Sequence, residues 1–356
     1  MNAHSGVKHT SHRAEPFRWA IVAAAVVVGL LHVLGALQVR EQVYRGYRSG
    51  DDRVIIEVIQ GGPADRAGLR VGDRLTRIDG IDAGDAKALA ARPRARVGHT
   101  QSIVIDRGGS SMEVQLILAG LPPIGVVAYL ASGLTGLSFL AFGLWAYFSA
   151  PRRTSRLLAN AGIGLGAIFT EQPYVASPFP RALQESGLIA AGVFGFAALL
   201  HFALVFPTER KVLGWRSAIL AIYAPAAIIS ALQTVATVLQ RGEPGGAVTT
   251  ATTAALVLVL ACFFLAVAAI VESCVRATPA ERAASGLNVL VVCMVLGLAP
   301  LVPTVVYLAA PGVVFPLSEY YDLTWVLIPF ALARATVLQA RSERAGARNT
   351  THAAGV

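Results

Sequence analysis

The sequence predicts an α-helical polytopic membrane protein with about eight transmembrane helices and one inserted α+β domain. The first observation is composition: of 356 residues, 55% are hydrophobic and 14% are charged, whereas soluble domains carry about 25% charged residues. The second is a series of apolar segments, most of them close to the roughly 20 residues that a helix needs to cross a bilayer. The third is a stretch between the first two segments whose short apolar runs and turn residues are typical of a small soluble domain.

The predicted transmembrane helices follow the apolar segments in chain order. They are Trp19–Leu37, Pro122–Phe148, Leu157–Thr170, Ser186–Phe206, Ser217–Leu239, Thr250–Val271, Leu287–Leu308 and Tyr320–Leu338. A cleaved signal peptide is the alternative for the first segment. Its apolar run is longer than usual, however, and Leu34 interrupts the small-residue pattern of a cleavage site, which favours an uncleaved signal anchor.

These segments divide the chain into five parts. Residues 1–18 form an N-terminal tail, residues 19–39 the signal-anchor helix, and residues 40–120 the inserted domain. Residues 121–340 form a seven-helix transmembrane bundle, and residues 341–356 form a C-terminal tail.

The placement of lysine and arginine predicts the orientation, because cytoplasmic loops carry an excess of these residues. With the N-terminus inside, fifteen of them lie in cytoplasmic segments or helix ends, and two, Arg181 and Arg241, lie in short external loops. Both termini are therefore predicted to be cytoplasmic and the inserted domain extracytoplasmic. The net charge of +9 follows mainly from this distribution, so nucleic acid is not an expected partner.

The inserted domain contains the run GGPADRAGLRVGDRLTRIDG at residues 61–80. The β-branched run Val54–Ile59 before it predicts a strand. Pro63 suits the first position of a short helix, and Asp79-Gly80 predicts a tight hairpin turn. Downstream, Ala86–Ala91 predicts a second short helix, followed by a hairpin of the strands Ser102–Asp106 and Met112–Leu118.

This run and this order of elements resemble the bacterial PDZ domains of periplasmic serine proteases and carboxyl-terminal processing proteases. The resemblance covers about Val43–Leu118 and implies binding of an extended peptide by main-chain pairing with a strand edge. It places the loop and strand of the groove at Tyr44, Arg45, Gly46, Tyr47 and Arg48, and the opposite wall at Ala86, Leu89 and Ala90.

The loop YRGYR departs from the usual Gly-apolar-Gly-apolar pattern of such grooves. Capture of a terminal carboxylate, binding of an internal segment and a vestigial groove therefore all stay open. A plain edge strand beside the membrane is the alternative for Tyr44–Arg48.

The bundle carries no catalytic pattern that would make the chain an enzyme. It has no H-E-x-x-H motif for a zinc protease, no G-x-S-x-G motif, and no lysine inside a predicted span. The three cysteines lie in or beside apolar segments and do not have zinc-ligand spacing. We therefore expect no catalytic residue, no metal and no cofactor.

The stretch LLHFALVFPTERK, Leu199–Lys211, contains the most informative pattern of the bundle. It resembles a motif in the membrane sensor halves of bacterial histidine kinases and serine/threonine phosphatases, some of which carry a PDZ domain between their first and second helices. The segment Ile328–Arg341 resembles the helix that leads into their cytoplasmic catalytic domain. Only the short tail from Ser342 follows here, so the resemblance implies a sensor or scaffold of the inner membrane without its catalytic domain.

His201 and Pro207 are the candidate sensing or gating residues of this motif. A polar residue inside a membrane span is a functional candidate because its burial costs free energy. The alternative for His201 is a structural imidazole that hydrogen-bonds a neighbouring helix.

The sequence favours the first of three functions, and the other two are its alternatives. The first is a non-enzymatic sensor or scaffold that binds a peptide or protein segment outside and couples it to a cytoplasmic or membrane signalling partner. The second is an accessory subunit that presents substrates to a membrane protease. The third is a small-ligand receptor or transporter that uses a bundle cavity around His201.

Overall fold

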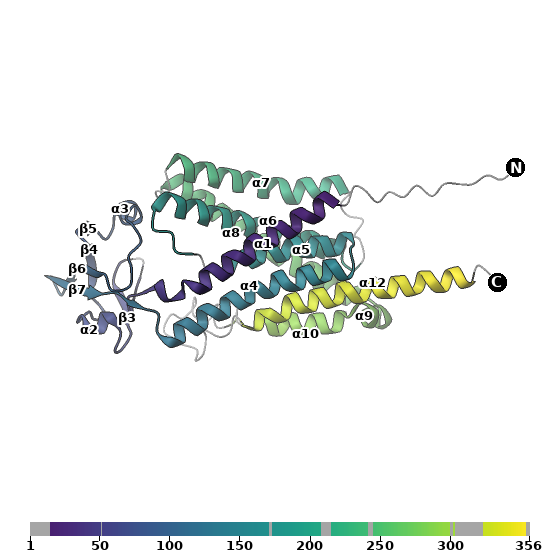
Figure 1. Ribbon diagram of the computed structural model, residues 1–356, viewed down its shortest axis with the longest axis horizontal. Coiled ribbons are helices and arrows are strands. Elements are labelled where there is room, and N and C mark those ends of the chain that lie inside the picture. Colours follow the sequence, from purple (N-terminus) through teal and green to yellow (C-terminus); the bar gives the residue numbers. More distant parts are fainter. Residues whose placement is uncertain are drawn as a thin grey trace.

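The molecule consists of a helical bundle with a small β-rich module at one end (Figure 1). The computed structural model describes residues 15–50, 52–170, 173–207, 215–240, 245–299, 302 and 323–353. Helix α1 begins, and helix α12 ends, at the end of the bundle opposite the module (Figure 1).

The bundle contains nine helices among the described residues. They are α1 (Glu15–Leu37), α4 (Pro123–Ser149), α5 (Arg153–Ile168), α6 (Pro178–Val205), α7 (Trp215–Leu239), α8 (Gly246–Arg276), α9 (Pro279–Ser285), α10 (Leu287–Leu298) and α12 (Leu327–Ala353). Some of the predictions fall on residues outside the described ranges. These are the N-terminal tail up to residue 14, Arg210, Lys211, and residues 303–322 at the end of the seventh and the start of the eighth predicted span.

Six described helices are long and apolar enough to cross a membrane, and a seventh span forms if α9 and α10 count as one. The latter two helices meet at a bend of 70°. Gly286 lies at this bend with φ 68°, a left-handed conformation that glycine adopts without strain. The predicted number of about eight spans is thus not confirmed, because α5 is not among the candidates.

Helix α5 differs from the other predicted spans because it is short and buried. It has 16 residues, and most of its side chains pack inside the bundle between α4 and α6. A Cβ atom on Gly164 would lie 2.4 Å from the Cα of Gly195 on α6, and one on Gly162 would lie 3.4 Å from the Cα of Gly143 on α4. Close approaches of this kind are typical of small-residue contacts between membrane helices.

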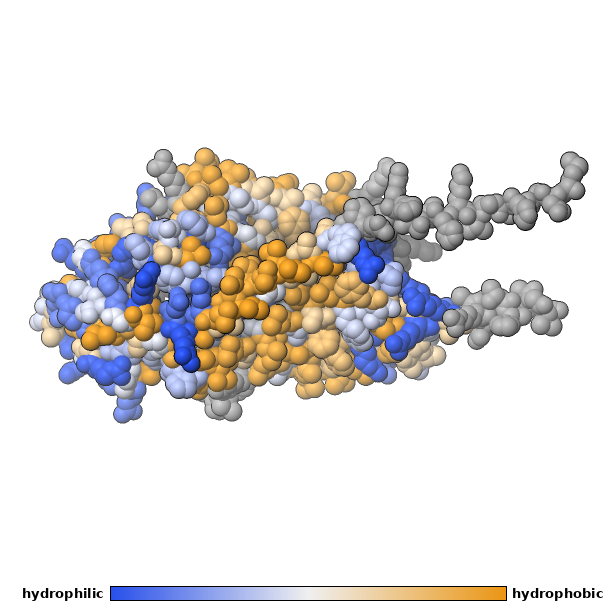
Figure 2. All heavy atoms as spheres, viewed as in Figure 1, coloured by the Kyte–Doolittle hydropathy of each residue, from blue (hydrophilic) through white to orange (hydrophobic). Residues whose placement is uncertain are grey.

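The outer surface of the bundle is apolar. Figure 2 shows an apolar band over the helices between a hydrophilic module and a hydrophilic far end. Val27 on α1, Leu134 on α4 and Leu260 on α8 are among the exposed large hydrophobic residues. Such a band would be unfavourable in water, so it indicates a membrane environment for these helices.

Among its described residues, the inserted module contains two short helices and eight strands, and a single 3-10 turn precedes them. They are η1 (Val39–Glu41), β1 (Val43–Tyr44), β2 (Tyr47–Ser49), β3 (Ile55–Val58), α2 (Pro63–Arg66), β4 (Arg74–Ile78), β5 (Ile81–Asp82), α3 (Ala86–Ala90), β6 (Thr100–Arg107), β7 (Ser110–Ile117) and β8 (Ala119–Gly120). Strands β5-β4-β6-β7 form an antiparallel sheet, β2 pairs with β3, and β1 pairs with β8. In the last pair, the strand through which the chain enters the module, β1, lies beside the strand through which it leaves toward α4, β8.

The local predictions for the module are confirmed. Pro63 is the first residue of α2, and Asp79-Gly80 forms the two-residue turn between β4 and β5, with positive φ at both residues. The module has its own core, in which Ile55, Leu75 and Ile103 are fully or almost fully buried. The β-branched runs therefore fold against one another rather than against the bundle.

Candidate functional site

The strand β2 presents an unpaired edge on the module. Tyr47 faces Val58 of β3, and the Ile59 N–H donates to the Gly46 carbonyl over 2.9 Å. In an antiparallel ladder this bond makes Tyr47 a non-hydrogen-bonded position, so its own N–H and C=O point away from β3. No other strand among the described residues pairs with β2. This edge can therefore accept an added strand.

The loop before β2 is held against helix α2. The Arg45 carbonyl accepts from the Ala64 N–H over 3.1 Å. Gly46 has φ 76°, and a Cβ atom there would lie 2.8 Å from Cδ of Pro63. The resemblance places this glycine in the loop of the peptide groove. The structure gives it a packing reason, because the start of α2 occupies the space of a side chain.

The other residues predicted on this side of the groove have different surroundings. Tyr44 belongs to β1 and faces Ala119 of β8, at the junction of the module with the membrane helices. Tyr47 packs against the module core, and burial raises the pKa of its phenol. Arg48 forms an exposed ion pair with Glu57 on β3 at 3.1 Å. Among the predicted residues Tyr44–Arg48, only those of β2, Tyr47 and Arg48, therefore lie on the open edge.

Helix α3 carries the predicted opposite wall. Its first turn is capped by Asp85, whose carboxylate accepts from the Ala88 N–H over 2.9 Å. Ala86 is exposed, while Leu89 and Ala90 are half-buried. Leu89 and Arg45 line one cleft, which has a volume of about 640 Å³. The structure thus places Leu89 of α3 and Arg45, which lies before β2, on the same cleft.

The end of α3 is attached to the bundle by contacts that sequence reasoning missed. The Arg181 guanidinium on α6 donates to the Ala90 carbonyl over 2.8 Å. The Tyr174 hydroxyl donates to the Arg94 carbonyl over 2.7 Å, and the Arg94 N–H donates to the Ala176 carbonyl over 3.3 Å. The only sequence signal was that Arg181 is one of two basic residues in the predicted external loops.

His201 lies within α6, and its side chain is 2% exposed. Its Nε2 is 3.2 Å from an Arg153 guanidinium nitrogen, and its Nδ1 is 3.2 Å from the Tyr223 hydroxyl. Because a guanidinium can only donate, Nε2 accepts and the proton lies on Nδ1. The imidazole thereby connects α6 to both α5 and α7.

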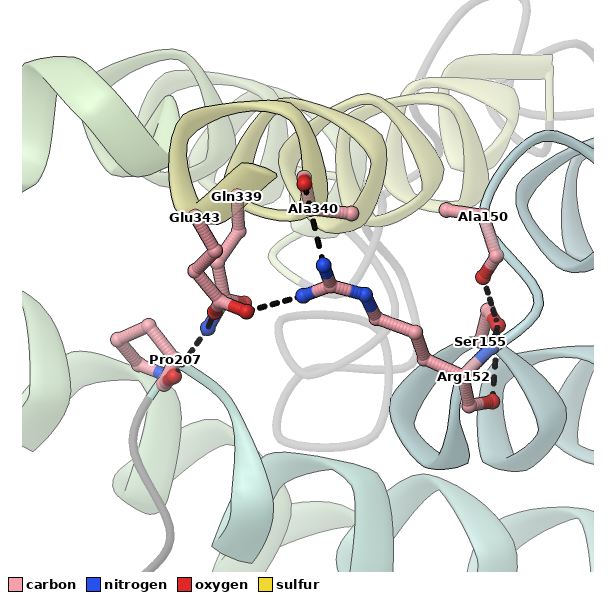
Figure 3. Close-up of polar contacts among 7 residues, drawn as sticks. All are labelled: Ala150, Arg152, Ser155, Pro207, Gln339, Ala340 and Glu343. Carbon is pink, nitrogen blue, oxygen red and sulfur yellow. Dashed lines mark hydrogen bonds and ion pairs between the residues drawn. The ribbon is translucent and has the colours of Figure 1, made fainter. Parts of the chain in front are cut away.

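Pro207 follows the end of α6, where Phe206 already has an extended backbone. The residue before a proline disfavours the helical conformation, so the helix ends here as predicted. The Pro207 carbonyl accepts a hydrogen bond from the Gln339 side chain on α12 (Figure 3). Both candidate residues of the motif therefore lie on contacts between α6 and other helices.

A second contact joins α12 to the loop between α4 and α5. The Arg152 guanidinium forms an ion pair with Glu343 and donates to the Ala340 carbonyl over 3.2 Å (Figure 3). The Ser155 hydroxyl holds this loop by bonding to the Ala150 carbonyl over 2.5 Å. Together, α6 and this loop hold α12 at the end of the bundle away from the module.

The described residues offer no set of ligands for a metal. Within the described ranges, no group of three or more His, Cys, Asp or Glu side chains is arranged so that it could hold a metal ion.

A comparison with protein families identifies the module. A family model described as a PDZ domain matches residues 54–107. The match covers β3 to β6 with both short helices, and it leaves β1 and β2 outside. The chain therefore contains a PDZ domain, and PDZ domains bind peptides. The sequence resemblance predicts such a peptide between the open edge of β2 and helix α3, and this location stays a prediction.

Proposed function

We propose that this protein is a non-enzymatic membrane sensor or scaffold. Its PDZ domain binds an extended peptide or protein segment, and helix α6 transmits the bound state to α12 and to a partner at the opposite membrane face. The resemblance of Leu199–Lys211 to membrane sensor halves supports this function. The fifteen-to-two charge asymmetry supports a PDZ domain outside and termini inside the inner membrane.

The observation that carries the proposal is the position of α6. Near its first residues, Arg181 bonds to the end of α3, the wall of the groove. Toward its last residues, His201 bonds to α5 and α7, and the following Pro207 bonds to α12. One helix thus contacts the peptide-binding domain and the helix that leaves the membrane. A shift of α3 upon binding would act on α6 directly.

The binding step can be tested through the backbone of the ligand. Random decapeptides are selected on the full-length chain in nanodiscs, and the tightest binder is then N-methylated at each position in turn. If it pairs with β2, methylation at every second residue removes a main-chain hydrogen bond and weakens binding about two- to tenfold. Methylation at the intervening residues, which face away from β2, leaves the affinity unchanged and is the matched control. Selection of no binder, or an effect without alternation, would reject strand addition.

One observation favours a small-ligand receptor as the second candidate function. A pocket of about 260 Å³ lies between α6, α7 and α8, and its lining includes Arg181, Ser186, Gln233 and Thr237. The last three of these side chains are buried, and the Gln233 side-chain oxygen has no hydrogen-bond partner among the described residues. This pocket is a better ligand site than the surroundings of His201, where both ring nitrogens already have partners. Loss of a cellular response in Gln233→Leu, with peptide binding intact, would favour this function.

A further inference from the structure

The cleft between the PDZ domain and the bundle is strongly basic. Five arginines line its volume of about 640 Å³, together with a single carboxylate, that of Asp79. The arginines are Arg45, Arg92, Arg94, Arg96 and Arg181. Four of them come from the domain and Arg181 comes from α6, so neither part of the molecule forms this cleft alone.

The single carboxylate neutralises only one of these charges. Asp79 forms an ion pair with Arg92 at 2.6 Å and also accepts from the Ser102 N–H over 2.9 Å. Arg94 and Arg96 lie over the ring of Tyr174, at 5.9 and 6.0 Å from its centroid. Among the described residues, none of the four other arginines has a carboxylate partner. A guanidinium held over an aromatic ring keeps its charge and its N–H donors for an anion.

The cleft continues the groove rather than the lipid-facing surface. Arg45 lies two residues before the start of β2, and Leu89 lies on α3, so both sides of the groove reach this cleft. No residue of α1 or α4 is among its lining. A strand that adds antiparallel to β2 places its C-terminal end at the start of β2, and hence at the cleft.

We infer that the ligand of this PDZ domain carries acidic side chains at the end that reaches the start of β2, and that arginines of both the domain and the bundle hold them. The inference rests on the proposed peptide binding and specifies its partner. It makes Arg181 a specificity residue contributed by the membrane bundle. Ligand recognition is then a property of the whole chain rather than of the PDZ domain alone.

The test uses the full-length chain in phosphatidylcholine nanodiscs and three pools of decapeptides with the same randomised core. The last three residues are all Glu, all Gln or all Lys, and each pool is made as the free acid and as the amide. We expect the Glu-ended amide pool to bind about tenfold more tightly than the Gln-ended amide pool, as several partly exposed ion pairs would together provide. The Lys-ended pool should bind most weakly.

Single variants assign this preference to the cleft. Arg181→Gln and Arg45→Gln should each reduce the ratio of Glu-ended to Gln-ended affinity about two- to fivefold, the range for one ion pair near the surface. Arg45→Gln removes a charge from the cleft but leaves the hydrogen bond between Arg181 on α6 and α3 in place. It therefore distinguishes the effect of the cleft's charge from the effect of the contact between domain and bundle. Arg70→Gln removes an exposed arginine of the same domain outside the cleft, and should leave the ratio unchanged.

The outcomes separate this inference from the proposed function. Equal affinities of the Glu-ended and Gln-ended amide pools would overturn the acidic preference and leave peptide binding established. A preference of the free acid over the amide in every pool, without any effect of the terminal side chains, would also overturn it. Binding by none of the pools would overturn both. If phosphatidylglycerol nanodiscs abolish the Glu preference, a lipid headgroup occupies the cleft and the peptide assignment is wrong.

Discussion

At the scale of single residues, the ion pair of Asp73 with Arg107 holds the PDZ domain together. Asp73 is 1% exposed, and Arg107 donates to its two carboxylate oxygens over 2.7 and 2.8 Å. Arg107 also donates to the Gly68 carbonyl over 2.7 Å. The hydrogen bonds from Arg107 lower the pKa of the Asp73 carboxyl below its ordinary value, against the effect of burial.

We predict that acid weakens the domain through this pair. Because the folded-state pKa of Asp73 is depressed, its stabilisation is fully present above the unfolded-state pKa, about 4. The stabilisation is lost as the pH falls through the folded-state pKa. Asp73→Asn should therefore lower the hydrogen-exchange protection of β4 and β6 at neutral pH, and the difference from wild type should shrink in acid. The exposed Asp82→Asn is the control, and a difference that does not depend on pH would contradict the assignment.

His201 allows a second prediction at this scale. His201→Phe keeps an aromatic ring but removes the bonds to α5 and α7, and should cost about 1–3 kcal/mol because it leaves buried groups without that partner. Tyr223→Phe removes one of the two bonds and should cost about 0.5–1.5 kcal/mol. Denaturant unfolding in detergent measures both. Wild-type stability of His201→Phe would show that the imidazole does not tie the helices together.

Sequence patterns located His201 better than they located its hydrogen-bond partners. His201 was identified because a polar residue in an apolar helix is conspicuous, and its hydrogen bond to another helix was the structural alternative. Arg153 and Tyr223 lie on other helices, and their approach depends on how the helices pack. The same holds for Arg181, whose role appears only once α6 and the PDZ domain lie side by side.

At the scale of elements, close glycine contacts hold the centre of the bundle. A Cβ atom on Gly195 would lie 2.8 Å from the Cα of Gly164, whereas one on Gly187 of the same helix would meet nothing within 4 Å. Both substitutions to alanine gain helix propensity, about 1 kcal/mol in water. Only the one at Gly195 forces α5 away from α6.

We therefore predict opposite effects for this matched pair. Gly195→Ala should destabilise the bundle by about 1–3 kcal/mol, the cost of overpacking a tight contact. Gly187→Ala should be neutral or stabilising. Denaturant unfolding of the two variants in the same detergent measures the difference, and equal effects would refute a close contact of α5 with α6.

Elements fixed by local chemistry were the ones that the sequence predicted. The turn at Asp79-Gly80 depends on two adjacent residues, and α2 depends on Pro63. Helix α5 was predicted as a span because it is apolar, but its apolar side chains face neighbouring helices, which periodicity alone cannot distinguish from lipid. The bend at Gly286 was also missed. Thr278 and Glu281 form the reciprocal cap that begins α9, so the sequence did carry a signal for a separate short helix before the bend.

At the scale of the whole molecule, the chain joins a peptide-binding domain to a membrane bundle through a composite contact. The chain enters the PDZ domain through β1 and leaves it through β8, and these two strands pair with each other. A hydrogen bond from Arg181 on α6 holds the end of α3. The same helix reaches α12 at the other end through Pro207 and Gln339 (Figure 3). The sequence predicted the two parts and their order. It did not predict this route, because residues far apart in the chain form it.

Binding of a peptide in the groove should change the hydrogen exchange of α12. This is tested by hydrogen exchange at the α12 amides from Gln339 to Ala345, with the full-length chain in nanodiscs and a selected peptide at saturation. Coupling between distant sites typically changes an equilibrium at least about fivefold, so a change of this size is predicted in wild type and its loss in Arg181→Gln at saturation. Identical α12 exchange with and without bound peptide would contradict the account.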